Sequence, residues 1–254
     1  MFFANNISGQ RTHIDDADPK ETYVCPACRC EMIQKRGNIN AHHFAHKASK
    51  ECDPWYSGKL SPWHTKMQNH FSPSSQEIII WNATHTGYHI ADVVLGNSGK
   101  KYVIEFQHSS ISQNEFMTRT RFYIECGYKI IWVFDFCECT PQKRILISKT
   151  GYENNIIQLV WPGRDRIRFL DNLDFSDFNN CLHIAFYINT GIGELQLHDP
   201  NGYAPWETWE YKNPFARHPC FVLLCPDYFT GVDSFFAQPY SEQAFFNMLK
   251  KLNK

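Results

Sequence analysis

Two segments of the chain place apolar residues at the three-to-four spacing that is typical of an amphipathic helix. The first begins at Ser61 and Pro62, a hydroxyl N-cap followed by proline at the first helical position, and its pattern continues to Phe71. The second covers residues 112–126 and stops at Gly127, a residue that favours the helix C-cap. The pattern therefore predicts two helices in this part of the chain.

Strand patterns lie between and after these two helices. Residues 77–81, 88–95 and 101–107 are strand candidates, and the Gly-Asn-Ser-Gly stretch at 96–99 predicts a hairpin turn between the last two. Residues 129–136 form a continuous apolar run, which is typical of a strand that is covered on both faces. The predicted order is helix, strand, strand, strand, helix, strand.

Changes of pattern divide the chain into three parts. Residues 1–58 are rich in Cys, His, charged and turn residues, as expected of a small module that is held together by a metal. Residues 59–150 contain the helices and strands described above, and residues 151–254 form an α+β region whose role the sequence does not indicate. Further elements are expected in this last part: strands at residues 156–161 and 220–224, and a helix from Ser241.

Composition and charge narrow the possible classes of protein. A chain of 254 residues that is 43% hydrophobic can bury a sizeable core. It shows no signal peptide and no run of about 18 apolar residues, so we expect a cytoplasmic protein without membrane contact. A net charge of −1 argues against binding of nucleic acid by bulk charge alone. Because residues 1–150 carry +3 and residues 151–254 carry −4, nucleic-acid contact is expected in the first part.

Asp92 and Glu105 are carboxylates that interrupt two apolar strand candidates. A charge at such a position costs free energy unless it is paired or binds a metal. An antiparallel hairpin can bring both side chains to one end of the sheet, where their oxygens suit Mg²⁺ or Mn²⁺. The two residues therefore predict a catalytic metal site.

The same two acids also fit the solvated face of a half-exposed sheet, about equally well on these two residues alone. Gln107 changes this balance, because residues two apart in a strand point to the same face, so that Glu105 and Gln107 lie together. This is the Glu-x-Lys spacing of PD-(D/E)XK nucleases, with Gln107 in the place of the lysine.

Several motifs that occur in one order carry a resemblance to a known family. They are Cys25-Pro-Ala-Cys28, His43-Phe-Ala-His46, Ser61-Pro-Trp-His64, His89-Ile-Ala-Asp92, Val103-Ile-Glu105-Phe-Gln107-His108-Ser109, Arg119 with Tyr123, and Ile131-Trp-Val133. Together they cover about residues 20–136 and closely resemble the competence protein CoiA-like nuclease family.

The resemblance implies a restriction-endonuclease-like PD-(D/E)XK fold, an α+β or α/β core with a mixed sheet flanked by helices. It also implies hydrolysis of DNA phosphodiester bonds with a divalent metal, in DNA uptake, recombination or defence against foreign DNA. Beyond about residue 150 the chain contains no motif that we can match, and this departure leaves the choice of substrate open.

Four helical side chains are candidates for contacts with the metal or the substrate. His64 would lie near the scissile phosphate or the metal, because the first helix of this fold borders the active site; a surface or capping histidine is the alternative. Gln68 shares that helix face one turn later. Arg119 and Tyr123 are spaced i and i+4 and fit phosphate binding, although a structural arginine that anchors the helix fits nearly as well.

A zinc site is predicted near the N-terminus. Cys25, Cys28, His43, His46 and Cys52 offer five ligands for a tetrahedral ion that needs four. Adjacent His42 or Cys30 could substitute, and the spacing does not decide between His43 and Cys52. A closed site of four protein ligands would be structural, whereas free thiols beside unrelated histidines are the alternative.

The sequence therefore favours a deoxyribonuclease with the catalytic residues Asp92, Glu105, Gln107 and His64. One alternative is a nuclease-like fold that has lost turnover, because Gln107 replaces lysine, and that grips DNA beside a recombinase. Another is a zinc-stabilised interaction protein whose acidic C-terminal region contacts a partner. The sequence does not indicate the oligomeric state.

Overall fold

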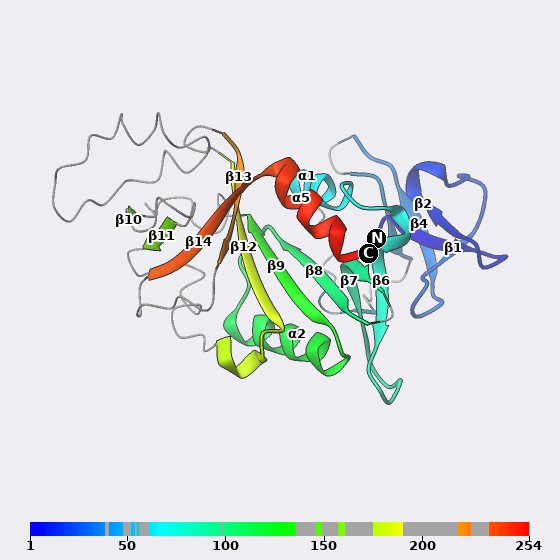
Figure 1. The fold of residues 1–254 in the computed structure, drawn as a ribbon. Coiled ribbons are helices and arrows are strands. Elements are labelled where there is room, and N and C mark those ends of the chain that lie inside the picture. The colour runs from blue at the N-terminus through cyan, green and yellow to red at the C-terminus, as the bar shows by residue number, and fades with distance from the viewer. Residues whose placement is uncertain are drawn as a thin grey trace. The chain divides into compact units, whose positions relative to one another are not determined.

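The structure is a computed structural model of the whole chain. It describes residues 1–38, 41–47, 52–53, 55, 61–97, 99–135, 146–148, 157–160, 175–189, 218–224 and 234–253. The chain divides into two compact units, Met1–Val94 and Leu95–Lys254. Both mix strands with a few helices, so the fold is mixed α+β (Figure 1). The predicted three-part division at residues 58 and 150 stays a prediction.

The first unit contains a small antiparallel sheet. Its strands are β1 (Phe3–Asn6), β2 (Arg11–His13), β3 (Tyr23–Val24), β4 (Glu31–Lys35) and β5 (His43–His46). They pair in the order β2-β1-β3-β4-β5, and the short 3-10 helix η1 (Ile14–Asp16) follows β2.

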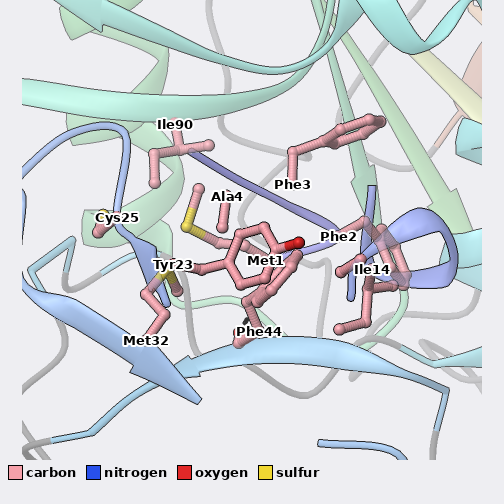
Figure 2. Close-up of a cluster of buried hydrophobic side chains, with 11 residues drawn as sticks. Met1, Phe2, Phe3, Ala4, Ile14, Tyr23, Cys25, Met32, Phe44 and Ile90 are labelled. Atoms are coloured by element: carbon pink, nitrogen blue, oxygen red, sulfur yellow. Dashed lines mark hydrogen bonds between the residues drawn. The ribbon is translucent and has the colours of Figure 1, made fainter. Parts of the chain in front are cut away.

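The core of this sheet is a cluster of buried apolar side chains, shown in Figure 2. Tyr23 and Phe44 are almost fully buried and their rings lie 5.0 Å apart. Cys25 belongs to the same cluster, as does Ile90 from a later strand of this unit. The cluster therefore joins the cysteine-rich segment to residues far along the sequence, which a module of this size needs for stability.

Helix α1 (Pro62–Gln68) begins as predicted, because the Ser61 hydroxyl accepts a hydrogen bond of 3.1 Å from the backbone N–H of His64. The helix ends about one turn before Phe71, which corrects its predicted end. The reason lies in Gln76, whose side-chain amide donates to the carbonyls of Gln68 at 3.0 Å and Phe71 at 2.9 Å. These carbonyls are satisfied without a further helical turn.

The predicted strands that follow α1 are confirmed. After the 3-10 helix η2 (Pro73–Ser75), β6 (Gln76–Trp81) pairs antiparallel with β7 (Tyr88–Gly96), and Ile79 lies opposite Ile90. The division between the two units falls within β7. Because β7 places Ile90 in the core of the first unit, that core fixes the strand that carries Asp92.

The second unit is built around a mixed sheet. Its elements are β8 (Lys101–Gln107), α2 (Gln113–Glu125), β9 (Lys129–Asp135), β10 (Leu146–Ser148), β11 (Ile157–Val160), η5 (Phe175–Phe178), β12 (Leu182–Ile188), β13 (Cys220–Leu224), β14 (Ser234–Ser241), α5 (Glu242–Lys250) and η8 (Lys251–Asn253). Its strands pair in the order β10-β11-β14-β13-β12-β9-β8. Figure 1 shows β8, β9 and β12 side by side; they are parallel, whereas the other pairs are antiparallel.

The two helices α2 and α5 cover opposite faces of this sheet. Trp132 and Phe134 of β9 face α2, since both rings contact Phe116. Phe221 of β13 pairs with Tyr187 of β12, and Tyr187 pairs with Asp135 of β9. Asp135 directly follows Phe134 in the strand, so these side chains lie on the other face of the sheet. The Phe221 ring stacks on Phe245 of α5, with centroids 4.2 Å apart. Burial on both faces explains the continuous apolar run in β9.

The turn after β7 requires glycine at one position. Gly96 has a φ of +124°, and a Cβ there would lie 2.1 Å from the carbonyl oxygen of Lys100. The Asn97 N–H donates to that same oxygen at 3.1 Å, which closes the turn. The predicted turn is confirmed, and Gly96 is the residue that permits it.

The later predicted elements are confirmed as β11, β13 and α5, and Ser241 caps α5 by accepting from Ala244 N at 3.2 Å. The structure adds β12 and β14, which the sequence analysis does not predict. None of the helices among the described residues combines the length and apolar character that a membrane span requires.

Candidate functional site

The Asp92 carboxylate in the first unit lies beside a histidine of α1. Asp92 sits on β7 and is 6% exposed. Its Oδ1 lies 3.1 Å from Nε2 of His64. α1 positions His64 because its N-cap fixes the first turn, and β7 positions Asp92 because its neighbours Ala91 and Val93 are fully buried. The structure thus brings together two of the predicted catalytic residues.

Gln68 adds a second group from α1. Its side-chain Nε2 donates to the backbone carbonyl of Asp92 at 3.2 Å, and the residue is fully buried. Its Oε1 has no hydrogen-bond partner among the described residues. A buried acceptor of this kind is expected to bind water or an ion. Carboxylate and amide oxygens are ligands that Mg²⁺ and Mn²⁺ accept, so the donor set around Asp92 fits the predicted cation.

Glu105 in the second unit is the most deeply buried acid of the predicted site. It lies on β8 and is 1% exposed. Its Oε1 accepts a hydrogen bond of 2.7 Å from the hydroxyl of Tyr123, and its Oε2 pairs with the guanidinium of Arg119. The two predicted substrate ligands of α2 therefore both bind Glu105. Their contact with phosphate stays a prediction.

Arg119 has two further neighbours that fix its place. Its Nη1 lies 3.5 Å from Oε1 of Glu115, one helical turn earlier, and its guanidinium lies over the ring of Trp132. Glu115 is partly exposed, whereas Glu105 is buried. Arg119 thus pairs with a buried carboxylate and with a partly exposed one. The charge of the buried Glu105 is balanced by Arg119.

Gln107 lies at the end of β8 and is partly exposed. Its side-chain Nε2 donates to the carbonyl oxygen of Ser109 at 2.8 Å. The strand register keeps Gln107 on the face of Glu105, as the alternation predicts. This contact holds the side-chain amide of Gln107 near the residues that follow β8. The catalytic role of Gln107 stays a prediction.

A second buried acid lies at the same end of the parallel strands. Asp135 ends β9, and its Oδ2 lies 2.9 Å from Nδ1 of His108, which directly follows β8. Asp135 is 5% exposed and its histidine partner is half-buried. The sequence analysis does not predict this pair; an acid that ends an apolar run is the signal that could have found it.

Three cysteines and a histidine converge in the first unit. The ligand atoms of Cys25, Cys28, His46 and Cys52 all lie within 4.8 Å of one another. Cys25 and Cys28 flank a turn in which Arg29 N donates to the Cys25 carbonyl at 3.0 Å, and β5 presents His46. This Cys₃His group could hold a metal ion, as the sequence predicts.

The spacing of these atoms fits a tetrahedral zinc ion. Sγ of Cys25 and Sγ of Cys52 lie 3.6 Å apart, and Sγ of Cys28 lies 3.3 Å from Nε2 of His46. Two thiolates on one tetrahedral zinc lie about 3.8 Å apart, and a thiolate and an imidazole about 3.5 Å. Burial, followed by the charges of Cys52 and Cys28, raises the pKa of Cys25 to about 12. A bound cation would offset the cost of that thiolate.

The structure shows which of the predicted zinc ligands lie close together. His43 does not belong to the group, and its Nδ1 bonds to the carbonyl of Ala41 at 2.8 Å. His42 lies near Asp15, with Nδ1 and Oδ1 3.3 Å apart. Cys30 is exposed and bonds through its backbone carbonyl to Cys25 N at 2.8 Å. Cys52 is thus the fourth member of the group, a choice that spacing left open.

Comparison with known protein families finds two matches on this chain. Residues 8–54 match the N-terminal domain of competence protein CoiA, and residues 65–175 match its nuclease-like domain. The chain belongs to the competence protein CoiA family. Comparison with curated proteins and with solved structures found no significant match.

The CoiA domains divide the candidate residues between them. All four members of the Cys₃His group lie within the N-terminal match, whereas Asp92, Glu105, Gln107, Arg119 and Tyr123 lie within the nuclease-like match. His64 directly precedes the nuclease-like match. The family assignment thus covers both sites that the sequence predicts.

One further buried acid, Asp53, was missed by the sequence analysis. It is 2% exposed and lies next to Cys52. Its Oδ1 lies 2.9 Å from Nδ1 of His89, and its Oδ2 accepts from the N–H of Ile90 at 2.8 Å. The ring of Trp55 stacks on His89 with an interplanar angle of 14°. The position of Asp53 next to a predicted zinc ligand is the one signal in the sequence that could have drawn attention to it.

Proposed function

We propose that this protein is a divalent-metal-dependent deoxyribonuclease that hydrolyses DNA phosphodiester bonds. The observation that carries the proposal is the Glu105 carboxylate, buried within the segment that matches a nuclease-like domain and held there by Arg119 and Tyr123. A buried acid with two dedicated partners is costly to keep, and such acids concentrate at functional sites. Family membership points to a role connected with competence, through DNA uptake and recombination or defence against foreign DNA.

The core of this nuclease is proposed to be of the PD-(D/E)XK type. The order α1, β6, β7, β8, α2, β9 supports it, because it repeats the helix, three strands, helix and strand that this fold requires. Parallel pairing of β8 with β9 supports it further, since the crossover between them is the helix α2.

Asp92 and Glu105 are the proposed acidic ligands of a Mg²⁺ or Mn²⁺ ion, with the orphaned Oε1 of Gln68 as a further oxygen donor. When bound, such a cation polarises a phosphate and lowers the pKa of coordinated water. The donor types support this assignment, since all three are hard oxygens.

The remaining side chains would orient the acids and move protons. The imidazole of His64, whose Nε2 lies 3.1 Å from Oδ1 of Asp92, would accept a proton from the attacking water. Arg119 and Tyr123 would hold the two oxygens of Glu105 in one orientation. Gln107 would orient the attacking water through its amide.

A second candidate function is a DNA-binding module that assists a recombinase and has lost turnover. Gln107 favours it, because an amide in the place of the usual lysine supplies no positive charge to the phosphate. Arg119 also favours it, because its guanidinium already supplies Glu105 with the positive charge that a cation would bring.

One experiment separates the two candidates. Purified protein is incubated with linear, circular and single-stranded DNA, with Mg²⁺, with Mn²⁺ and with EDTA. The nuclease reading expects metal-dependent cleavage of at least one substrate that EDTA abolishes. Binding of DNA without cleavage under every condition would replace it by the binding-module reading.

A further inference from the structure

Two consecutive residues at the zinc group contact three consecutive residues of β7. The carbonyl of Cys52 accepts a hydrogen bond of 3.3 Å from the hydroxyl of Tyr88. The two carboxylate oxygens of Asp53 contact His89 Nδ1 at 2.9 Å and Ile90 N at 2.8 Å. Residues 52 and 53 therefore form a clamp on the start of β7, which we call the Asp53 clamp.

The Asp53 clamp is a specific arrangement and not a chance surface contact. Asp53 is 2% exposed, and a buried carboxylate keeps its place only where its oxygens are satisfied. Its Oδ1 also accepts from the N–H of Trp55 at 3.0 Å, and the Trp55 ring covers His89. These contacts tie Trp55 to Asp53 and His89 and shield the pairing of Asp53 with His89 from water.

The position of the clamp depends on the Cys₃His group. Cys52 precedes Asp53 directly and contributes one of the four ligand atoms. Its thiol makes a weak contact of 3.6 Å with Sγ of Cys25. A bound ion would replace that contact with a metal–thiolate bond and fix the chain at Cys52.

Asp92 lies two residues beyond the clamped Ile90. Residues two apart in a strand point to the same face, so a shift of β7 at Ile90 carries Asp92 with it. Ile90 also belongs to the same buried cluster as Cys25, shown in Figure 2. The contacts of Asp92 with His64 and Gln68 require β7 in this one place.

We propose that Asp53 is a positioning residue that couples the zinc group to β7 and so to the carboxylate of Asp92. Zinc bound at Cys52 holds the Asp53 clamp, and the clamp holds the backbone on which Asp92 stands. Chelation of zinc, or oxidation of its thiols, therefore loosens β7 and weakens cation binding at Asp92. By thermodynamic linkage, a cation at Asp92 strengthens zinc binding by the same factor. Only the part that concerns the cation rests on the proposed function.

Hydrogen exchange of the full-length protein tests the coupling without any DNA. The amide exchange of residues 88–92 is measured with zinc bound and after zinc is removed by a chelator. We expect at least tenfold faster exchange of the Ile90 amide in the zinc-free protein. If the amides of β7 exchange at an unchanged rate after metal analysis has verified the loss of zinc, the proposal is overturned. This test needs only the wild-type protein.

Two variants then locate the coupling in the clamp. Asp53→Asn keeps the shape of the side chain but loses a carboxylate acceptor, and His89→Phe keeps the stacked ring but loses Nδ1. Each is expected to retain one equivalent of zinc and to exchange Ile90 rapidly whether or not zinc is present. The exposed Asp15→Asn is the matched control and should respond to zinc as the wild type does. A wild-type zinc response in both clamp variants would contradict the proposal.

Cleavage provides a readout that a purely structural role would not move. In the wild type, zinc removal should raise the Mn²⁺ concentration for half-maximal cleavage about tenfold, with a smaller effect at saturating Mn²⁺. If zinc protects β7 but no DNA is ever cleaved, the proposed function fails and the coupling stands. If DNA is cleaved and the Mn²⁺ dependence ignores zinc, the link to Asp92 fails.

Discussion

The hydroxyl of Tyr123 donates a hydrogen bond of 2.7 Å to Oε1 of Glu105, although the two residues lie on different elements, α2 and β8. Both side chains are buried, and Arg119 occupies the other oxygen of the acid. The charge of Glu105 is therefore balanced by the guanidinium and its orientation is fixed by the phenol. This three-residue group surrounds the candidate acid of the second unit.

Tyr123→Phe removes only the hydroxyl of this group. A hydrogen bond to a buried charged group contributes about 1.5–3 kcal/mol, so we expect the free energy of unfolding to fall by that amount. Denaturant unfolding checks it, with Tyr128→Phe as the control for loss of a hydroxyl elsewhere in the unit. Equal stability of Tyr123→Phe and the wild type would show that the bond does not hold Glu105.

Zinc ligands can be tested against a neighbouring cysteine. Cys28→Ser should lower the zinc content well below one equivalent and lower the melting temperature, because structural zinc contributes directly to the folding free energy. Cys30→Ser and His43→Ala should leave both unchanged, since neither residue belongs to the group. Metal analysis and a melting scan measure the two effects. Purified wild-type protein with less than about half an equivalent of zinc would refute the site.

The partly buried imidazole of His183 on β12 predicts a pH dependence of stability. Burial, followed by the charge of Lys129, lowers its pKa below the ordinary value of 6.5. The unfolded chain then binds a proton more readily than the folded chain, so stability is lost as the pH falls below about 6.5. His183→Gln should flatten the unfolding free energy between about pH 7 and pH 5. An identical slope for the variant and the wild type would exclude His183 as a cause.

Gln107→Ala separates orientation of water from a bystander role. If the amide orients the attacking water, its loss should lower the cleavage rate by about 10-fold to 100-fold while DNA binding is retained. The defect should be smaller than that of Asp92→Asn, which removes charge from the proposed metal site. Single-turnover cleavage and a binding titration measure the two quantities separately. A wild-type rate would mark Gln107 as structural.

Much of this fold can be predicted from local patterns. The helices capped by Ser61, Ser112 and Ser241 begin where a hydroxyl precedes helical spacing, since the cap is a property of neighbouring residues. The strand β12 was missed although its residues 182–188 are mostly apolar. Its place follows from parallel pairing with β9, a long-range relationship that no local pattern contains.

The candidate site residues also include some that local patterns indicate and some that only long-range contacts reveal. Spacing in the sequence indicates Asp92, Glu105 and all four members of the Cys₃His group, because metal ligands are restricted to few residue types. Asp53 could not be ranked in this manner, since its importance arises from a hydrogen bond to Ile90, which lies far along the chain. Likewise, Arg119 has the same charge whether it binds phosphate or a protein acid, and only the structure places it on Glu105.

Cleavage by Glu105→Gln beside Glu115→Gln tests the central claim most directly. Both acids contact Arg119 and both changes are isosteric, but only Glu105 is proposed to bind the catalytic cation. With Mg²⁺ or Mn²⁺ we predict that Glu105→Gln cleaves at least about 100-fold more slowly while binding DNA nearly as tightly, and that Glu115→Gln stays within about threefold of wild type. Melting scans verify that both variants are folded. Wild-type cleavage by folded Glu105→Gln would contradict the account.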